Sequence, residues 1–249
     1  MGKVEIFPLK GLPEVGKRSD VGGLVMAALD RAGIELKDRD IVVVKQKVVS
    51  KAEGQVVRLS EVVPGRRAES LAKAEGKDPR LMELVLREAV RVVRSGHGVV
   101  ITETKHGFVC ANSGVDQSNV GKGCASLLPV DSDLSARKIR KTLEDRTGKR
   151  LAVVVTDTFG RPWRRGQTDV AIGCSGIDPL VSFMGKADRF GYALRVTEPA
   201  VVDEVAGAAE LAMGKLDRVP VAVVRGVRYA RGEGGVKSLI MQRERDLFR

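Results

Sequence analysis

The sequence predicts a protein of the α/β to α+β class, with mixed sheets flanked by helices. Short apolar runs bounded by polar residues, at 40–46, 151–155 and 220–225, are typical of buried strands. Between such runs lie longer segments whose apolar residues recur at helical spacing. Strands and helices alternate without a strict βαβ rhythm, so we expect a mixed rather than a purely parallel sheet.

In the first half of the chain, two capping signals predict helices. Asp20 is a suitable N-cap for a helix that ends at Gly33, and Asp78 with Pro79 begins a helix that we expect to continue to Gly96. Apolar residues at helical spacing support the second helix: Leu81, Leu84, Val85, Ala89, Val92 and Val93. Strands are expected at 4–7, 40–46, 98–102 and 107–111.

In the second half, we expect a helix over 132–146 that stops at Gly148 and turns Ala136, Ile139 and Leu143 inward. Pro199 begins another helix, which ends at Gly214. Strands are expected at 151–155, 169–173, near 193–197 and at 220–225. The segments 107–111 and 169–173 are candidates for hairpin partners.

The 249 residues are interpreted as a single module, residues 1–249, long enough to bury a substantial core. The hydrophobic content of 43% and the absence of low-complexity tracts favour a compact protein. We find no internal repeat and no proline-rich linker. Two subdomains are therefore expected with a boundary that the sequence does not locate.

The chain carries a formal net charge of +11, which suggests nucleic acid, an anionic membrane or a polyanionic small substrate as a partner. Acidic residues are interspersed with the basic ones, aromatic residues make up only 4%, and no nucleic-acid motif is present. Three cysteines are too few and too scattered for a disulfide framework. The first residues contain no apolar signal region, and no run has membrane-spanning length, so we expect a cytoplasmic protein without a membrane partner.

The first candidate site is the polar segment 156–169, which follows the apolar run 151–155. Asp157 offers a metal ligand or base, Thr156 and Thr158 offer hydroxyls, and three arginines at 161, 164 and 165 suit phosphate or carboxylate. The alternative is a solvated basic loop. The position of this segment at the end of a buried strand favours an anion or metal site.

A second polar segment, 112–119, follows the predicted strand 107–111 and contains Asp116. Taken alone it resembles an ordinary turn rich in Asn and Asp. Two strand ends that each supply an aspartate make a divalent-cation site beside nucleotide phosphates more plausible. Standard phosphate-binding motifs are absent. Cations for phosphate could come from Lys45, Lys47 and Lys51, or backbone amides from residues 10–13.

Five strings in this order identify a family resemblance: VVSKAEG at 48–54, NSGVDQSN at 112–119, TDTFGRPWRRG at 156–166, MGK at 213–215 and VVRG at 223–226. Together they resemble the gamma-glutamyl ligases that extend the side chain of the deazaflavin coenzyme F420. The resemblance spans essentially the whole chain. It corresponds to the stand-alone form, without the nitroreductase-like domain that follows in some bacterial relatives.

The resemblance implies GTP-dependent amide-bond formation, an acid–amino-acid ligase of class EC 6.3.2. L-Glutamate is added to coenzyme F420-0 and then to F420-1 through gamma linkages, by way of an acyl phosphate, with release of GDP and phosphate. The resemblance also implies Mg²⁺ or Mn²⁺, potassium as an additional ion, and an intertwined homodimer of two interleaved subdomains. All three substrates are anionic, which accounts for the positive charge without a nucleic-acid partner.

Carried over by motif, the family's metal and catalytic aspartates correspond to Asp116 and Asp157, and a second metal is served by Thr158. The guanine nucleotide is associated with a larger set, namely Lys10, Gly11, Leu12, Pro13, Gln46, Lys47, Lys51, Asn119, Met213, Gly214, Lys215 and Pro220. One position departs from the family. Some archaeal members carry an acid where this chain has Lys215, and an ammonium has no lone pair to give to a metal ion and would repel it. We interpret Lys215 as a phosphate contact, with a metal contact through its backbone carbonyl as the alternative.

Two other functions are compatible with parts of the sequence. A metal-dependent nucleotide phosphohydrolase would use the same carboxylates, and a basic RNA-binding module would account for the charge. The residues alone do not distinguish GTP from ATP, do not give the number of glutamates added, and do not assign Arg161, Arg164 or Arg165.

Overall fold

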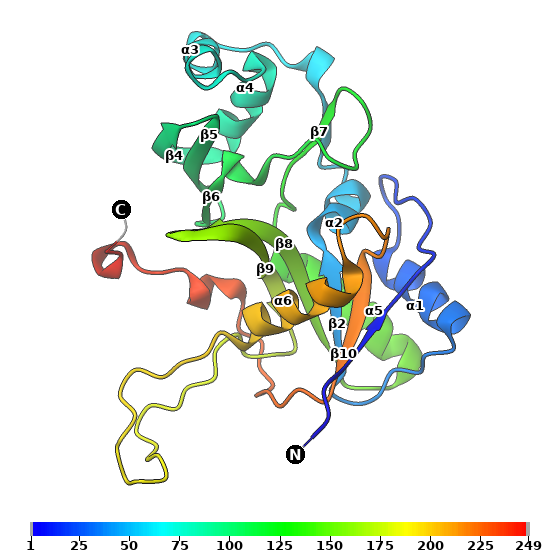
Figure 1. The fold of residues 1–249 in the computed structure, drawn as a ribbon. Coiled ribbons are helices and arrows are strands. Elements are labelled where there is room, and N and C mark those ends of the chain that lie inside the picture. The colour runs from blue at the N-terminus through cyan, green and yellow to red at the C-terminus, as the bar shows by residue number, and fades with distance from the viewer. Residues whose placement is uncertain (1, 248–249) are drawn as a thin grey trace.

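A computed structural model describes residues 2–247 and is built around one mixed sheet of five strands (Figure 1). The strands follow the order β1 (Glu5–Pro8), β10 (Val221–Arg225), β2 (Ile41–Lys45), β8 (Ala152–Arg161) and β9 (Arg164–Ser175). Only β2 and β8 are parallel, and the other neighbours are antiparallel. The predicted fold class, mixed sheets with flanking helices, is confirmed.

Helices cover both faces of this sheet. α1 (Val21–Ala32) and α5 (Ser132–Thr147) pack on one face, and α6 (Val201–Met213) packs on the other (Figure 1). Along β8 the buried side chains alternate accordingly: Val153 and Val155 join the core under α1 and α5, whereas Ala152 and Val154 join the core under α6. This alternation is the period-two pattern of a strand that is buried on both sides.

The predicted helix boundaries are largely confirmed. The Asp20 carboxylate accepts from the backbone N–H of Gly23 at the start of α1, and Gly33 ends that helix in the left-handed conformation at φ 64°. Gly148 ends α5 in the same way. A short helix, α2 (Gln46–Glu53), follows β2 directly.

A smaller unit lies at one edge of this body and has a core of its own (Figure 1). It contains α3 (Arg66–Glu75), α4 (Pro79–Glu88) and the antiparallel strands β4 (Ala89–Gly96), β5 (Val99–Thr104) and β6 (Val109–Ala111). The pair β3 (Val56–Arg58) and β7 (Cys124–Ser126) connects the two parts of the chain.

Two predicted elements are wrong, and so is the hairpin suggested between 107–111 and 169–173, because β6 pairs with β5 and β9 pairs with β8. The helix that begins at Asp78 ends at Glu88, and the residues up to Gly96 form β4. The β-branched residues of that segment pair with β5 in a sheet, which outweighs their helical spacing. The strand predicted near 193–197 is also wrong. These residues belong to an extended arm in which Ala193 forms only an isolated bridge with Ala187.

The polar segment after 151–155 is not a loop. β8 continues to Arg161 and β9 begins at Arg164, so the two strands form a long hairpin that extends beyond the rest of the sheet (Figure 1). The pairing of β2 with β8 stops at Thr156, and the polar residues beyond it need no apolar neighbour on the β2 side. Within residues 2–247, no helix is long and apolar enough to span a membrane.

Candidate functional site

A cleft of about 1310 Å³ opens beside the junction of the main sheet and the smaller unit. Four segments line it: residues 12–17, the stretch from Lys45 to Val56, residues 119–121 and residues 214–220. Among the lining residues, six are basic (Lys17, Lys45, Lys47, Lys51, Lys215 and Arg218) and only Glu14 is acidic. The cleft is therefore suited to a polyanionic ligand.

The cleft brings together most of the nucleotide residues predicted from the sequence. Eight of them line it, namely Leu12, Pro13, Lys47, Lys51, Asn119, Gly214, Lys215 and Pro220. Lys10 and Gly11 are exposed and lie outside the lining. Segments far apart in sequence meet here because β2 and β10 are neighbours in the sheet and α2 begins where β2 ends.

Gln46 and Met213, two further predicted nucleotide residues, are buried in the protein. The Gln46 side-chain amide donates to the backbone oxygen of Leu127 at 3.0 Å and to the Ser50 hydroxyl at 2.5 Å. Met213 packs in the core beneath α6. Both sit next to residues that line the cleft, but their side chains stabilise the walls and do not face the ligand space.

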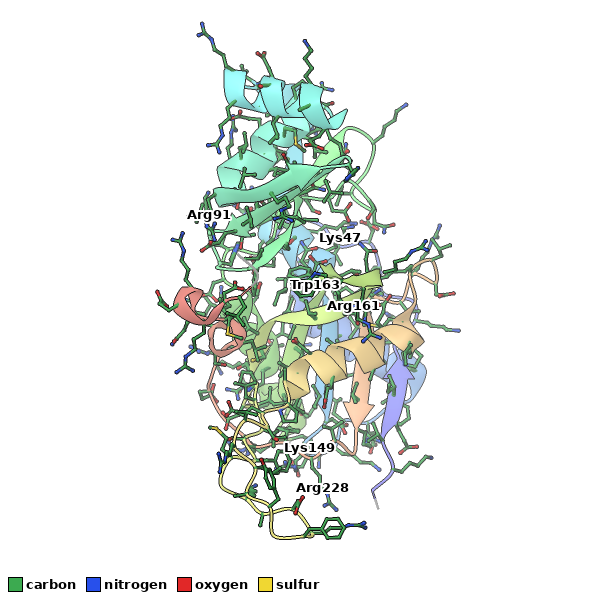
Figure 2. The ribbon with its side chains drawn as sticks, turned by 60° about the vertical axis from the view of Figure 1, so that its left-hand side comes forward. Lys47, Arg91, Lys149, Arg161, Trp163 and Arg228 are labelled. Atoms are coloured by element: carbon green, nitrogen blue, oxygen red, sulfur yellow. The ribbon has the colours of Figure 1, made fainter. Side chains whose placement is uncertain are left out.

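Asp116 is held at the edge of the cleft by a backbone bridge to Ser126. Its carboxylate pairs with Lys47 and accepts from the backbone N–H and hydroxyl of Ser118 at 2.9 and 2.8 Å. Burial works against ionisation, but the hydrogen bonds from Lys47 and Ser118 and the charge of Lys47 outweigh it. The pKa of Asp116 is therefore lowered, and the side chain is an anion at neutral pH. Figure 2 shows Lys47 between the two parts of the molecule.

Asp157, on β8, behaves differently. Its pKa is raised to about 7, chiefly by burial and to a smaller extent by the negative charges of Asp169 and Asp116, while the backbone N–H of Thr158 and the charge of Lys47 oppose the shift. Asp157 is thus half-protonated near neutral pH in the absence of an added cation. The charge of Lys47 does not offset the cost of ionising this buried carboxyl group.

Thr158 follows Asp157 but belongs to the opposite face of the hairpin, because successive side chains of a strand alternate. Thr158 and Asp169 are register partners on β8 and β9, and the Thr158 hydroxyl donates to the Asp169 carboxylate at 2.6 Å. This places Thr158 on the α6 side. The structure therefore does not bring Thr158 together with the pair Asp116 and Asp157.

On that opposite face, a second charged cluster, here called the cleft floor, lies beneath the lining residues Lys45 and Lys215. Lys215 pairs with Asp169 at 3.0 Å and with Glu210 of α6 at 2.8 Å, and Lys45 pairs with Glu210 at 2.6 Å. Lys45 also donates to the backbone oxygen of Gly214 at 2.7 Å. Asp169 and Glu210 were not among the predicted site residues. The sequence signal for Asp169 is its place next to the apolar residues 170–172 of a predicted strand, and the structure shows it almost fully buried, where a carboxylate needs partners.

The residues fit a divalent cation at one of these places only. Asp116 and Asp157 supply hard oxygen atoms, and burial together with the neighbouring carboxylates raises the pKa of Asp157, so a bound cation would favour its ionised form. Among the described residues, no three Asp, Glu, His or Cys side chains form a ready-made metal cluster. Further ligands would have to come from phosphate, water or backbone oxygen atoms.

The other reactive side chains do not contribute a nucleophile. Burial raises the pKa of Cys110 and of Cys174 to about 12, so both thiols stay protonated. At the hairpin turn, Arg161 donates to the backbone oxygen of Arg165 at 3.1 Å and does not line the cleft (Figure 2).

Comparison with known proteins decides the family. The family model described as "F420-0:Gamma-glutamyl ligase" matches residues 11–226. The chain belongs to this family. It is 44% identical to "Coenzyme F420:L-glutamate ligase" of Methanothermobacter thermautotrophicus, over 99% of both chains. It is 46% identical to the protein of the same name from Methanocaldococcus jannaschii, over 99% of this chain and 97% of the relative.

A third gamma-glutamyl ligase relative, from Methanopyrus kandleri, is 43% identical over 90% of this chain and 91% of its own length. The matched residues 11–226 include the cleft lining, the carboxylates Asp116 and Asp157, and the charged floor. The family resemblance seen in the five sequence strings is therefore confirmed. The chain is a member of an enzyme family of ligases.

Proposed function

We propose that this protein is a GTP-dependent ligase that adds L-glutamate to coenzyme F420-0 and then to F420-1 through gamma-linked amide bonds. The names of the relatives, which state coenzyme F420 and L-glutamate, support the two organic substrates. The observation that carries the nucleotide part is the basic cleft, because it gathers eight of the twelve predicted nucleotide residues. We place the reaction in the cytoplasm, where a nucleotide co-substrate is available.

In this proposal the triphosphate lies along the lysines of the cleft. Lys47 and Lys51 project from one side of α2, one helical turn apart, and both line the cleft. Their present partners are carboxylates, Asp116 for Lys47 and Glu14 for Lys51. A phosphate group would compete for the same ammonium groups. Lys17 and Arg218 add positive charge at the cleft wall.

Asp116 and Asp157 would hold Mg²⁺ or Mn²⁺ between the protein and the phosphates, with potassium as an additional ion. Such a cation neutralises charge on the transferred phosphoryl group. The protein's own part is positioning: Ser118 and the Ser126 bridge fix Asp116, and the hairpin fixes Asp157. Neither step of the reaction requires a protein nucleophile.

The chemistry we propose has two steps. A carboxylate oxygen of the coenzyme attacks the γ-phosphorus of GTP, the bond to the bridging oxygen breaks, and GDP leaves with that electron pair. The amine of L-glutamate then attacks the acyl carbon, loses a proton, and inorganic phosphate leaves as the amide forms. Lysine side chains in the cleft offset the negative charge of both steps.

Incubation of the protein with F420-0, GTP, L-glutamate and Mn²⁺ or Mg²⁺ tests the proposal. We expect a mass increase by glutamyl units, together with one GDP for each amide formed. Phosphate release that does not depend on the coenzyme would favour a nucleotide phosphohydrolase. Salt-sensitive RNA binding without GTP binding would favour a basic RNA module.

We also propose a homodimer of interleaved subdomains. The arm at 182–197 extends away from the body (Figure 1) and exposes large apolar side chains, including Phe190, Tyr192 and Val196. Backbone hydrogen bonds between its two sides, such as Leu194 N–H to Lys186 O at 2.8 Å, give it a defined shape. An exposed apolar arm of this kind suits contact with a second copy. Light scattering on the wild type and on Phe190→Ser with Tyr192→Ser should show a dimer that dissociates in the variant.

A further inference from the structure

The ammonium group of Lys215 has oxygen neighbours on three sides. It lies 3.0 Å from the Asp169 carboxylate, 2.8 Å from the Glu210 carboxylate and 2.5 Å from the Thr158 hydroxyl. An ammonium group has three N–H donors and no acceptor, so these three contacts use all of its donors. Lys215 nevertheless lines the cleft, because its side chain is about half exposed.

Carboxylate and hydroxyl oxygen atoms are also the ligands that Mg²⁺, Mn²⁺ and K⁺ take in proteins. Three of them, on β8, β9 and α6, surround one point on the cleft floor, and that point is filled by a lysine. We propose that Lys215 is a built-in cation, which takes the place that a metal ion would otherwise occupy between Asp169, Glu210 and Thr158.

The charges of the cluster support this proposal. Asp169 and Glu210 carry two negative charges, and Lys45 and Lys215 carry two positive ones, so the cluster is neutral as it stands. Without Lys215, it would keep one uncompensated negative charge, and Asp169 is almost fully buried. An uncompensated buried charge is costly and attracts a cation.

The ammonium stays charged under ordinary conditions. Its ammonium lies 3.0 Å from the Asp169 carboxylate and 2.8 Å from the Glu210 carboxylate, and these two anions favour its charged form. A permanently charged lysine also keeps Thr158 oriented, because the hydroxyl can donate to Asp169 while it accepts from Lys215. Lys215 is thus a positioning residue at the floor of the cleft.

This interpretation replaces the phosphate contact that the sequence suggested for Lys215, since its three donors are already used within the protein. The inference rests on the proposed function only because that function places a nucleotide above the cluster. The test counts bound metal ions, and this count does not require that the protein be active. If the protein proves not to be a GTP-dependent ligase, the number of metal ions held by each variant is still a valid test.

The direct test counts bound Mn²⁺ by electron paramagnetic resonance on the full chain in the presence of excess GDP. Lys215→Glu replaces the ammonium with a further oxygen ligand, and we expect it to bind one more Mn²⁺ per chain than the wild type. Lys149→Glu makes the same charge change at the opposite end of the sheet (Figure 2) and should add none. Equal Mn²⁺ numbers in the wild type and Lys215→Glu would overturn the proposal.

A second measurement does not depend on the folding of a Lys215 variant. Thr158→Val removes the hydroxyl and keeps the β-branched shape, in a chain that retains Lys215. We expect its bound Mn²⁺ to equal that of the wild type, because no ion uses Thr158. A loss of one Mn²⁺ per chain would show that a metal does bind there and would contradict the built-in cation.

Discussion

The two faces of the β8–β9 hairpin carry carboxylates in opposite electrostatic states. On one face, Asp157 lies near Asp116, which pairs with Lys47, and the pKa of Asp157 is raised to about 7. On the other face, Asp169 is nearly as buried as a core residue, yet Lys215 and Thr158 satisfy it. The two carboxylates therefore differ in a neighbouring cation: Lys215 pairs directly with Asp169, whereas burial is the main cause of the raised pKa of Asp157.

The largest expected effect comes from the face that is short of positive charge. Asp116→Asn and Asp157→Asn should each lower the ligase rate by roughly 10²- to 10³-fold, because each removes part of the charge that would hold the cation against phosphate. Steady-state assays of amide formation would measure this. Asp145→Asn, at an exposed pair on α5, is the control and should keep its rate. Wild-type rates in both site variants would contradict the proposal that Asp116 and Asp157 hold a cation that the reaction needs.

On the neutral face, we expect an effect on stability. Asp169→Asn should lower the free energy of unfolding by about 3 kcal/mol, because it breaks a buried ion pair and leaves Lys215 and Glu210 unbalanced. Urea unfolding followed by circular dichroism would give the value. The same change at exposed Asp145 should cost less than about 0.5 kcal/mol. If the two variants unfold alike, the cluster does not stabilise the fold.

Asp157 should also give the protein a pH-dependent stability without added metal. Its pKa in the folded protein is about 7, above the ordinary value of 3.8, so the folded state holds an extra proton between these values. Stability should therefore fall as the pH rises from 4 to 7. At pH 8 we expect Asp157→Asn to have a free energy of unfolding about 2 kcal/mol above that of the wild type, and therefore a higher melting temperature. This figure allows for the partial exposure of Asp157, and at pH 4 the two proteins should differ little.

That expectation can be checked by thermal melts in the presence of a chelator across this pH range. Asp116→Asn provides the contrast, because the pKa of Asp116 is lowered, and its loss should not stabilise the protein at pH 8. A wild type and an Asp157→Asn variant with parallel pH profiles would show that Asp157 does not carry the shift.

The smallest effect concerns the cleft wall. Lys51→Gln should weaken GTP binding by roughly five- to tenfold, about 1 kcal/mol, because it removes one of several cations that face the phosphates. Calorimetric titration with GTP would measure the change, and Lys149→Gln, far from the cleft in Figure 2, should leave binding unchanged. Equal affinity for both variants would mean that the triphosphate lies elsewhere.

Local signals in the sequence were sufficient for many elements. Asp20 and Gly33 predicted the ends of α1, and the apolar runs predicted β2, β8 and β10, because caps and burial depend on neighbours a few residues away. The helix expected through Gly96 failed for the converse reason. β4 forms because it pairs with β5, and the spacing of apolar residues within β4 gives no sign of that pairing.

The same division holds for the site. The sequence by itself determined the family and the basic character of the chain, and it predicted Asp116 and Asp157 as site residues, because these depend on residue identity in short strings. Only the tertiary structure decided that Thr158 lies on the opposite face from Asp157. It also brought Asp169 and Glu210 together at the cleft floor, where both pair with Lys215. The physical reason is strand alternation combined with the pairing of distant segments: alternation separates residues that are adjacent in sequence, and folding unites charges more than 40 positions apart, such as Asp169 and Lys215.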